Sequence, residues 1–275
     1  MEIGVSAFIT DEGPHPARLA AQAEERGFAS LFLPEHTHIP VRRESRWPGG
    51  EDPLPRAYLR SADPFVALAM AAQATTRLRL GTAVTLLAQR DPIVTAKEIA
   101  TLDLFSGGRT VLGVGSGWNR EEARNHGVPV ARRAAVVAEY VRAMTAIWTQ
   151  ERPEFHGEFL DFDPIHCRPK PLRRPEVLVG GWGRSTFDRI LDHADGWLAP
   201  RTDDLDTLAP GITELRQRAG ARGREVGVTA YVRPDAPADL EMAAELGIER
   251  VIVDLTQCPP DEVPAALDRQ VRAAA

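Results

Sequence analysis

Eight short apolar segments recur along the chain, and each is followed by a stretch whose apolar residues have helical spacing. The apolar segments are continuous runs, which are typical of parallel strands covered by helices rather than of strands with one solvated face. The expected strands span 2–9, 29–34, 78–86, 109–115, 176–180, 196–199, 226–232 and 250–255. The expected helices span 15–27, 63–75, 92–105, 131–149, 184–194, 204–219, 237–246 and 260–273.

Eight strand-then-helix units predict an α/β fold of the closed (β/α)8 TIM-barrel type, with an open doubly wound sheet as the alternative. The length of 275 residues suits one such barrel, so we expect 1–275 to be a single domain. Two segments exceed the short connections of a barrel and are interpreted as insertions, 36–61 after the second strand and 151–175 before the fifth. Because barrel chemistry lies on loops after the strands, the stretch LFLPEHTHIP (31–40) is placed at the mouth.

Charge and cysteine content restrict the class of partner. The chain has 33 basic and 39 acidic residues, a balance that argues against nucleic acid or an anionic membrane as partner. Its two cysteines, far apart in sequence, form no disulfide framework, and it lacks the ~18-residue apolar run of a membrane-spanning helix. The start MEIGVSAFIT does not have the pattern of a signal peptide, so a cytoplasmic location is expected.

A metal site is the first possible role for the histidines at the mouth. His36 and His38, at the end of an expected barrel strand, resemble the first ligand pair of metal-dependent hydrolases of the amidohydrolase type, and Asp254 ends the last expected strand. Two imidazoles and one carboxylate close a metal site poorly, and the middle strands end without further histidines, since His193 falls within a helix. The sequence therefore favours a site without metal.

Two glycine-rich turns are better candidates for binding. GVGSGW (113–118) follows a strand, but Trp118 occupies the third glycine position of a dinucleotide fingerprint. VLVGGWGRST (177–186) ends a strand and opens a helix, where unpaired N–H groups and the helix dipole favour a phosphate. In this turn Arg184 adds positive charge and Ser185 is a candidate helix cap. An ordinary glycine-rich loop is the alternative for either turn.

The stretch LGTAVTLLAQRDPIVTAKEIATLDLFSGGRTVLGVGSGWNREE (80–122) closely resembles the third and fourth units of luciferase-like monooxygenases. GGWGRS and ADGW (within 180–197) resemble their phosphate loop and next strand, and the similarity extends over essentially the whole chain. LPEHTHIP resembles the branch that uses the deazaflavin coenzyme F420. Departures from F420-dependent sugar-phosphate dehydrogenases are Trp118 and Asn119 where those have a glutamate, and Pro40 where they have a tryptophan.

The resemblance implies a TIM-like barrel, often a homodimer, that binds a flavin or deazaflavin at its mouth. It implies that Glu35 contacts the ring system and that His36 lies near the hydride-transfer face and acts in proton transfer. A bulge with a non-proline cis peptide at Ala83–Val84 is expected to back the central ring. The ring side is expected to be lined by Gly115, Ser116, Gly117 and Trp118, and the phosphate is expected to be held by Gly180, Gly181, Trp182, Gly183, Arg184 and Ser185.

The leading hypothesis is an F420-dependent oxidoreductase that exchanges a hydride with a small organic substrate, with His36 and Glu35 as catalytic residues. The alternative is an FMN-dependent monooxygenase that receives reduced flavin from a partner reductase and uses oxygen. A carrier or sensor without turnover is the third possibility. The sequence assigns no role to His38 and does not name the substrate.

Overall fold

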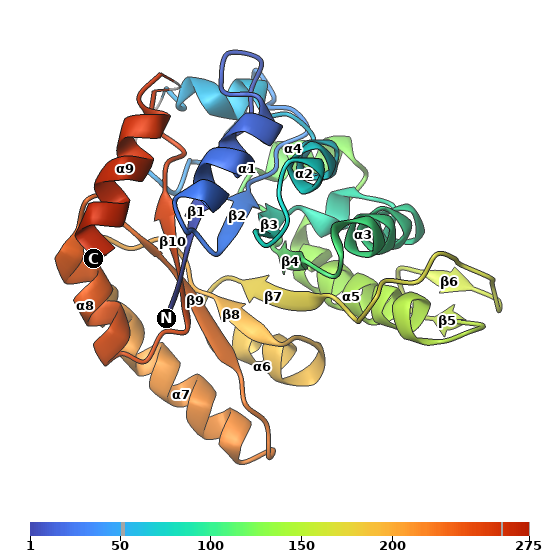
Figure 1. Cartoon of the computed structure of the whole chain (residues 1–275). Helices are drawn as coiled ribbons and strands as arrows, with labels where there is room; N and C mark the ends of the chain where they lie inside the picture. Colours follow the sequence, from blue (N-terminus) through green and yellow to red (C-terminus); the bar gives the residue numbers. More distant parts are fainter. Residues whose placement is uncertain (51–52, 260, 275) are drawn as a thin grey trace.

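Eight parallel strands form a closed barrel in the order β1-β10-β9-β8-β7-β4-β3-β2, as seen in a computed structural model that describes residues 1–50, 53–259 and 261–274 (Figure 1). The predicted barrel is confirmed, and the open sheet is excluded by the pairing of β1 with β10. The barrel strands are β1 Glu2–Ser6, β2 Ser30–Leu33, β3 Arg79–Thr85, β4 Thr110–Val114, β7 Glu176–Gly180, β8 Gly196–Leu198, β9 Gly227–Val232 and β10 Arg250–Asp254. Residues 51 and 52 of the first expected insertion, residue 260 of the last expected helix and residue 275 lie outside the described residues.

Helices cover the outer face of the barrel (Figure 1). They are α1 Pro16–Glu25, α2 Pro64–Gln73, α3 Pro92–Ser106, α4 Arg120–Asn125, α5 Arg133–Thr149, α6 Arg184–His193, α7 Ala209–Gly220, α8 Pro237–Glu245 and α9 Val263–Ala274. Several begin at a proline whose preceding side chain caps the helix: Asp63 accepts from the amides of Phe65 and Val66 at the start of α2. None of the helices among the described residues is long and apolar enough to cross a membrane.

The two segments expected as insertions differ in structure. Between β2 and α2 the described residues contain only one short 3-10 helix, η1 (Arg56–Arg60). Between α5 and β7 the chain forms an antiparallel hairpin of β5 (Phe155–His156) and β6 (Asp161–Phe162), which extends outward beside α5 (Figure 1). The hairpin lies within EFHGEFLDF (154–162), which the sequence marks as a strand-like patch. The short helix α4 was not predicted, because a few residues carry too little periodicity to identify a helix.

The inside of the barrel is filled by side chains from most of its strands, and a second core lies between the strands and the helices. The inner cluster consists of Phe32, Ala83, Val111, Leu178, Leu198, Tyr231 and Ile252. At the strand starts, Arg250 donates to Glu2 at 3.1 Å and to Glu176 at 3.2 Å. Apolar side chains and this ion network fill the barrel from its base, so the main cavity lies at the opposite end.

Candidate functional site

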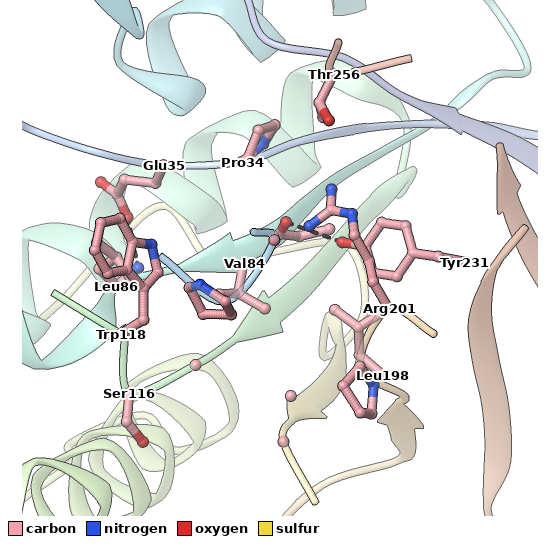
Figure 2. A pocket seen from close by; sticks show the side chains of 18 of the residues that line it. Pro34, Glu35, Val84, Leu86, Ser116, Trp118, Leu198, Arg201, Tyr231 and Thr256 are labelled. Atoms are coloured by element: carbon pink, nitrogen blue, oxygen red, sulfur yellow. Dashed lines mark hydrogen bonds between the residues drawn. The ribbon is translucent and has the colours of Figure 1, made fainter. Parts of the chain in front are cut away.

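A cavity of about 540 Å³ opens at the C-terminal ends of the barrel strands. That volume is within the range of about 300–1,000 Å³ usual for cofactor and small-molecule sites. Figure 2 shows Trp118 on one side of the cavity, Arg201 and Tyr231 on the other, and Val84 between them. Its lining includes Phe8, Pro34, Glu35, His36, Trp47, Tyr58, Ala83, Val84, Leu86, Gly115, Ser116, Gly117, Trp118, Gly180, Gly181, Thr186, Arg189, Leu198, Arg201, Tyr231, Asp254 and Thr256.

The floor of the cavity is the end of β3, where the chain bulges between Thr82 and Thr85 and the Ala83–Val84 peptide is cis. This is the non-proline cis bond that the family resemblance implied. The phenol of Tyr231 donates to the carbonyl of Ala83 at 3.1 Å, and burial raises the pKa of Tyr231 to about 12, so the phenol keeps its proton. The barrel interior therefore supports the bulge from below.

Val84 projects between the two glycine turns that follow β4 and β7. A Cβ atom added at Gly115 would lie 2.6 Å from Cγ2 of Val84, and one added at Gly180 would lie 3.2 Å from its Cγ1. Carbon atoms pack at about 3.5–4.0 Å, so a side chain does not fit at Gly115 without a shift of Val84. The two turns thus meet the bulge closely and leave the surface of Val84 facing the cavity.

Glu35 is nearly fully buried, and its carboxylate is bound on both oxygens. One oxygen accepts from the amide of Leu86 at 2.7 Å, and the other accepts from Nε of Arg90 at 2.6 Å. Burial raises the pKa of Glu35 above its ordinary value, although Arg90 and the Leu86 amide oppose that shift. The carboxylate therefore ties the end of β2 to the residues that follow β3.

His36 forms a buried pair with Glu122, a residue of α4 that is 0% exposed. Nδ1 of His36 lies 2.8 Å from Oε2 of Glu122, and the indole N–H of Trp118 donates to Nε2 at 3.3 Å. A carboxylate accepts and an indole N–H only donates, so the proton of the neutral ring is on Nδ1 and Nε2 carries the lone pair. The ring of His36 lines the cavity, which makes Nε2 a proton acceptor at the cavity wall.

Aromatic side chains surround His36. The ring of Tyr58 lies 5.4 Å from that of His36 and 4.7 Å from that of Phe8, and the rings of Trp118 and His36 are 5.6 Å apart. Trp47 packs edge-on against Tyr58. This part of the cavity is therefore apolar and suits an uncharged organic group.

The start of α6 forms another wall. Gly181 and Gly183 have φ of +122° and +90°, a region that other residues rarely adopt, and no side chain caps the helix. Arg189 lines the cavity and donates to Thr186 Oγ1 at 3.0 Å, while burial lowers the pKa of Arg189. No carboxylate among the described residues forms an ion pair with this arginine. The amides of Thr186 and Phe187 donate to the carbonyl of Gly183, so the positive end of the α6 dipole and an arginine without a carboxylate partner are what suit an anion here.

Arg201 and Asp254 form the wall opposite Trp118. They are ion-paired through Arg201 Nε, and the Arg201 guanidinium lies 4.1 Å from the ring centre of Tyr231. Although burial opposes the charge, Tyr231 and Asp254 raise the pKa of Arg201, which stays cationic. Asp254 thus has an arginine as partner rather than the histidines considered above, and the described residues contain no cluster of three or more His, Cys, Asp or Glu that could hold a metal ion.

The residues predicted from the sequence separate into two groups. Those from β2, β3, β4 and β7 line one cavity: Glu35, His36, Ala83, Val84, Gly115, Ser116, Gly117, Trp118, Gly180 and Gly181. Trp182, Gly183, Arg184 and Ser185 are not part of its lining, and Trp182 packs against Trp197 at 5.2 Å. The expectation that Ser185 caps α6 is wrong, because Gly183 is the N-cap and the helix begins at Arg184.

Sequence reasoning missed Glu122, Tyr58, Arg189, Arg201 and Tyr231. Glu122 lies in the first turn of α4, where an acidic side chain ordinarily stabilises the helix dipole. Its position in the sequence therefore did not indicate a contact with His36. Arg189 was detectable, because it stands one helical turn after Thr186 and thus faces the same way as the start of α6. His38 and His193 lie outside the cavity lining.

The chain is similar to proteins of one family over nearly its full length. The family model for luciferase-like monooxygenase matches residues 4–263. An uncharacterized protein of Mycobacterium tuberculosis (strain ATCC 25618 / H37Rv) is 42% identical over 274 residues, which cover 98% of this chain and 97% of that protein.

Solved structures share the fold. The monooxygenase RslO1 from Streptomyces bottropensis superimposes with a TM-score of 0.83 at 19% identity, covering 99% of this chain and 98% of that one. An F420-dependent secondary alcohol dehydrogenase in complex with an F420–acetone adduct superimposes with a TM-score of 0.78 at 17% identity, covering 100% of each chain.

Proposed function

Because the chain belongs to the luciferase-like monooxygenase family, we propose that it is an oxidoreductase that binds coenzyme F420 at the barrel mouth and transfers a hydride between the deazaflavin and a small organic substrate. One observation carries the proposal: His36, whose Nδ1 lies 2.8 Å from Oε2 of the buried Glu122, lines a cofactor-sized cavity. Hydride transfer to or from an alcohol or carbonyl requires a matching proton transfer, and this imidazole is the group placed to perform it.

The residues present fit a flat, phosphate-bearing cofactor. Val84 offers an apolar face between Gly115 and Gly180, whose missing side chains leave room for a ring to lie against it. Gly181, Thr186 and Arg189 would hold the phosphate at the start of α6. When bound, the deazaflavin supplies the carbon that accepts or gives the hydride, while the protein supplies position and charge.

His36 moves the proton in this proposal. Glu122 fixes the tautomer by accepting from Nδ1, and it stabilises the positive charge when Nε2 takes a proton from the substrate. The bond from Trp118 to Nε2 is long at 3.3 Å, so a substrate hydroxyl can replace it. A positioned acid–base group of this kind contributes about 10²–10⁴-fold to the rate.

We assign Glu35 a positioning role rather than the catalytic one expected from the sequence. Its two oxygens are held by the Leu86 amide and the Arg90 guanidinium, an arrangement that suits a fixed structural contact. Through these bonds Glu35 holds the end of β3 and therefore the ring-facing surface of Val84. The aromatic group around His36 favours a substrate with an apolar body next to the reacting carbon.

Separate titrations with F420 and FMN test the choice of cofactor. We expect F420 to bind and its absorbance to fall upon reduction, with weak or no binding of FMN. Tight FMN binding without F420 binding would reverse the assignment in favour of the alternative, a monooxygenase supplied with reduced FMN by a partner reductase. The structural similarity to the monooxygenase RslO1 is the reason to retain that alternative.

Replacing His36 by alanine tests the catalytic role. With bound F420 and a panel of small alcohols and ketones, we expect His36→Ala to lower kcat by about 10²–10⁴-fold and to leave the F420 dissociation constant nearly unchanged. His156→Ala is the matched control, because His156 is exposed on the hairpin and pairs only with Asp161 there. Unchanged turnover in His36→Ala would remove the residue from its role. Bound cofactor with no turnover in the wild type would favour a carrier.

We also propose that the protein is a homodimer. Apolar side chains on α2 and α3 are exposed in the single chain, with Val66 58%, Val94 54% and Phe105 80% accessible. Faces of this kind ordinarily mark protein–protein contacts. Light scattering should give twice the mass of one chain, and Phe105→Glu should reduce it to a single chain if the proposal is right.

A further inference from the structure

His36 has a second hydrogen-bonded side that leads away from the cavity. Glu122 Oε1 accepts from the amide of Thr37 at 3.0 Å and from its hydroxyl at 3.4 Å. The Thr37 hydroxyl also lies 2.8 Å from Nε2 of His126 and 3.0 Å from Nδ1 of His38. A continuous series of polar atoms therefore joins the buried imidazole to two histidines at the surface.

Burial changes abruptly along this series. His36 is 7% exposed and Glu122 is 0% exposed, whereas Thr37, His38 and His126 are exposed. None of Thr37, His38, Glu122 and His126 lines the cavity. The series thus reaches solvent outside the lining of the cavity.

We propose that Glu122, Thr37 and the His38–His126 pair form a proton relay that connects Nδ1 of His36 with solvent by a route that does not pass through the cavity. The need for such a route in turnover rests on the proposed function: a cofactor and substrate bound in the cavity that His36 lines would shield its Nε2 from water. Through the relay, Nδ1 of His36 gains a proton from solvent or loses one to it. It also gives His38 a role.

The proton count balances along the path. A proton taken at Nε2 makes the imidazolium, and the Nδ1 proton then passes to Oε2 of Glu122. After a half-turn of the carboxyl group, Glu122 gives that proton to Thr37 Oγ1, and the Thr37 hydroxyl proton passes to Nε2 of His126. His38 orients the hydroxyl by donating from Nδ1 to Thr37 Oγ1, because the Asn125 amide donates to its Nε2. Water removes a proton from the outer ring nitrogen. One proton enters and one leaves, only N–H and O–H bonds change, and no electron is transferred.

Thr37 is the residue that allows this path, because a hydroxyl is both donor and acceptor and turns to suit either neighbour. Rings of His38 and His126 lie 5.5 Å apart, and Asn125 Nδ2 lies 2.9 Å from Nε2 of His38, which holds that ring in place. Imidazole is the side chain whose ordinary pKa allows uptake and release of a proton near neutral pH.

Exchange of the His36 Nδ1 proton with water tests the relay, measured by nuclear magnetic resonance on the full chain with isotope-labelled histidine and no cofactor or substrate. We expect Thr37→Val to slow the exchange by about tenfold or more, and Thr37→Ser to preserve it because it keeps the hydroxyl. The double variant His38→Gln/His126→Gln should also slow exchange, and added imidazole buffer should restore it. The position of the Nδ1 proton resonance reports whether the bond to Glu122 is intact.

An exchange rate in Thr37→Val or in the double histidine variant equal to that of the wild type would overturn the relay. A failure of imidazole to restore the exchange rate of the double variant would do the same. Because no cofactor is present, a failed F420 titration leaves this measurement intact. Conversely, normal F420 turnover by the wild type, together with unchanged Nδ1 proton exchange in Thr37→Val, would refute the relay and leave the proposed function standing.

Discussion

Replacing Gly115 by alanine should displace Val84, the residue that faces the proposed ring site. A Cβ atom at this position would lie 2.6 Å from Cγ2 and 3.3 Å from Cβ of Val84, whereas carbon atoms pack at about 3.5–4.0 Å. The overlap is therefore about 1 Å. Gly115 is not one of the glycines with positive φ, so alanine fits the backbone and the contact with Val84 is the only conflict among the described residues.

The magnitude follows from how little Val84 can retreat. Movement away from Gly115 brings its other methyl group towards Gly180, where an added Cβ would already be 3.2 Å away. Overpacking of this kind costs about 1–3 kcal/mol of unfolding free energy. Each kcal/mol lowers the midpoint of thermal unfolding by about 2–4 °C in a protein of comparable size. The F420 dissociation constant should rise as well, because Val84 no longer presents the same surface.

A thermal unfolding series on four variants measures the contact. Gly227→Ala is the control, since nothing lies within 4 Å of a Cβ at that glycine. In the double variant Gly115→Ala/Val84→Ala the conflict is removed, so its loss should be smaller than the sum of the two single losses by about 0.5–3 kcal/mol. Additive losses, or a Gly115→Ala protein as stable as the control, would refute the reasoning.

Two charged sites give the remaining predictions. Arg90→Leu leaves Glu35 buried without its cation and should lower the free energy of unfolding, measured in urea, by about 3–5 kcal/mol. Arg56→Leu is the control, because Arg56 belongs to an exposed pair and its loss should cause no measurable change. Equal losses in the two variants would contradict the role of burial. For Glu176, burial alone would raise the pKa, but Arg250 and Arg79 together outweigh burial and lower the pKa below 4.5. The stability that ionised Glu176 contributes is therefore fully present above pH 4.5 and is lost as the pH falls through the lowered pKa of the folded state. In thermal melts, the difference in melting temperature between the wild type and Glu176→Gln should shrink below pH 4.5.

Much of the barrel was predictable because its signal is local. The runs at 109–115 and 250–255 contain β4 and β10. An aspartate cap followed by a proline at the first helical position marks the start of both α2 and α3. The ends of β1 were not predictable to the residue, since 7–9 continue the apolar pattern after the strand pairing stops at Ser6. An apolar residue at the barrel mouth packs in the same way whether or not its backbone is paired.

The cavity lining was only partly predictable. The family resemblance implied the cis peptide at Ala83–Val84 and the glycine turns around it, and these residues do meet at one cavity. The partner of His36 could not be predicted from the sequence, because Glu122 is 86 positions away and its local pattern is that of a helix start. At the start of α6 the arginine in the cavity lining is Arg189, whereas Arg184, five residues earlier, is not part of that lining.

By itself the sequence determined which segments become strands and helices, because apolar spacing and capping residues act over a few neighbours. From that it determined a barrel with Glu35 and His36 at the mouth. The tertiary structure alone decided which atoms those side chains bind: Glu35 is held by Arg90, and His36 is joined to Glu122 and through it to Thr37. The physical reason is that hydrogen bonds and ion pairs depend on distances of about 3 Å between residues brought together only by closure of the barrel.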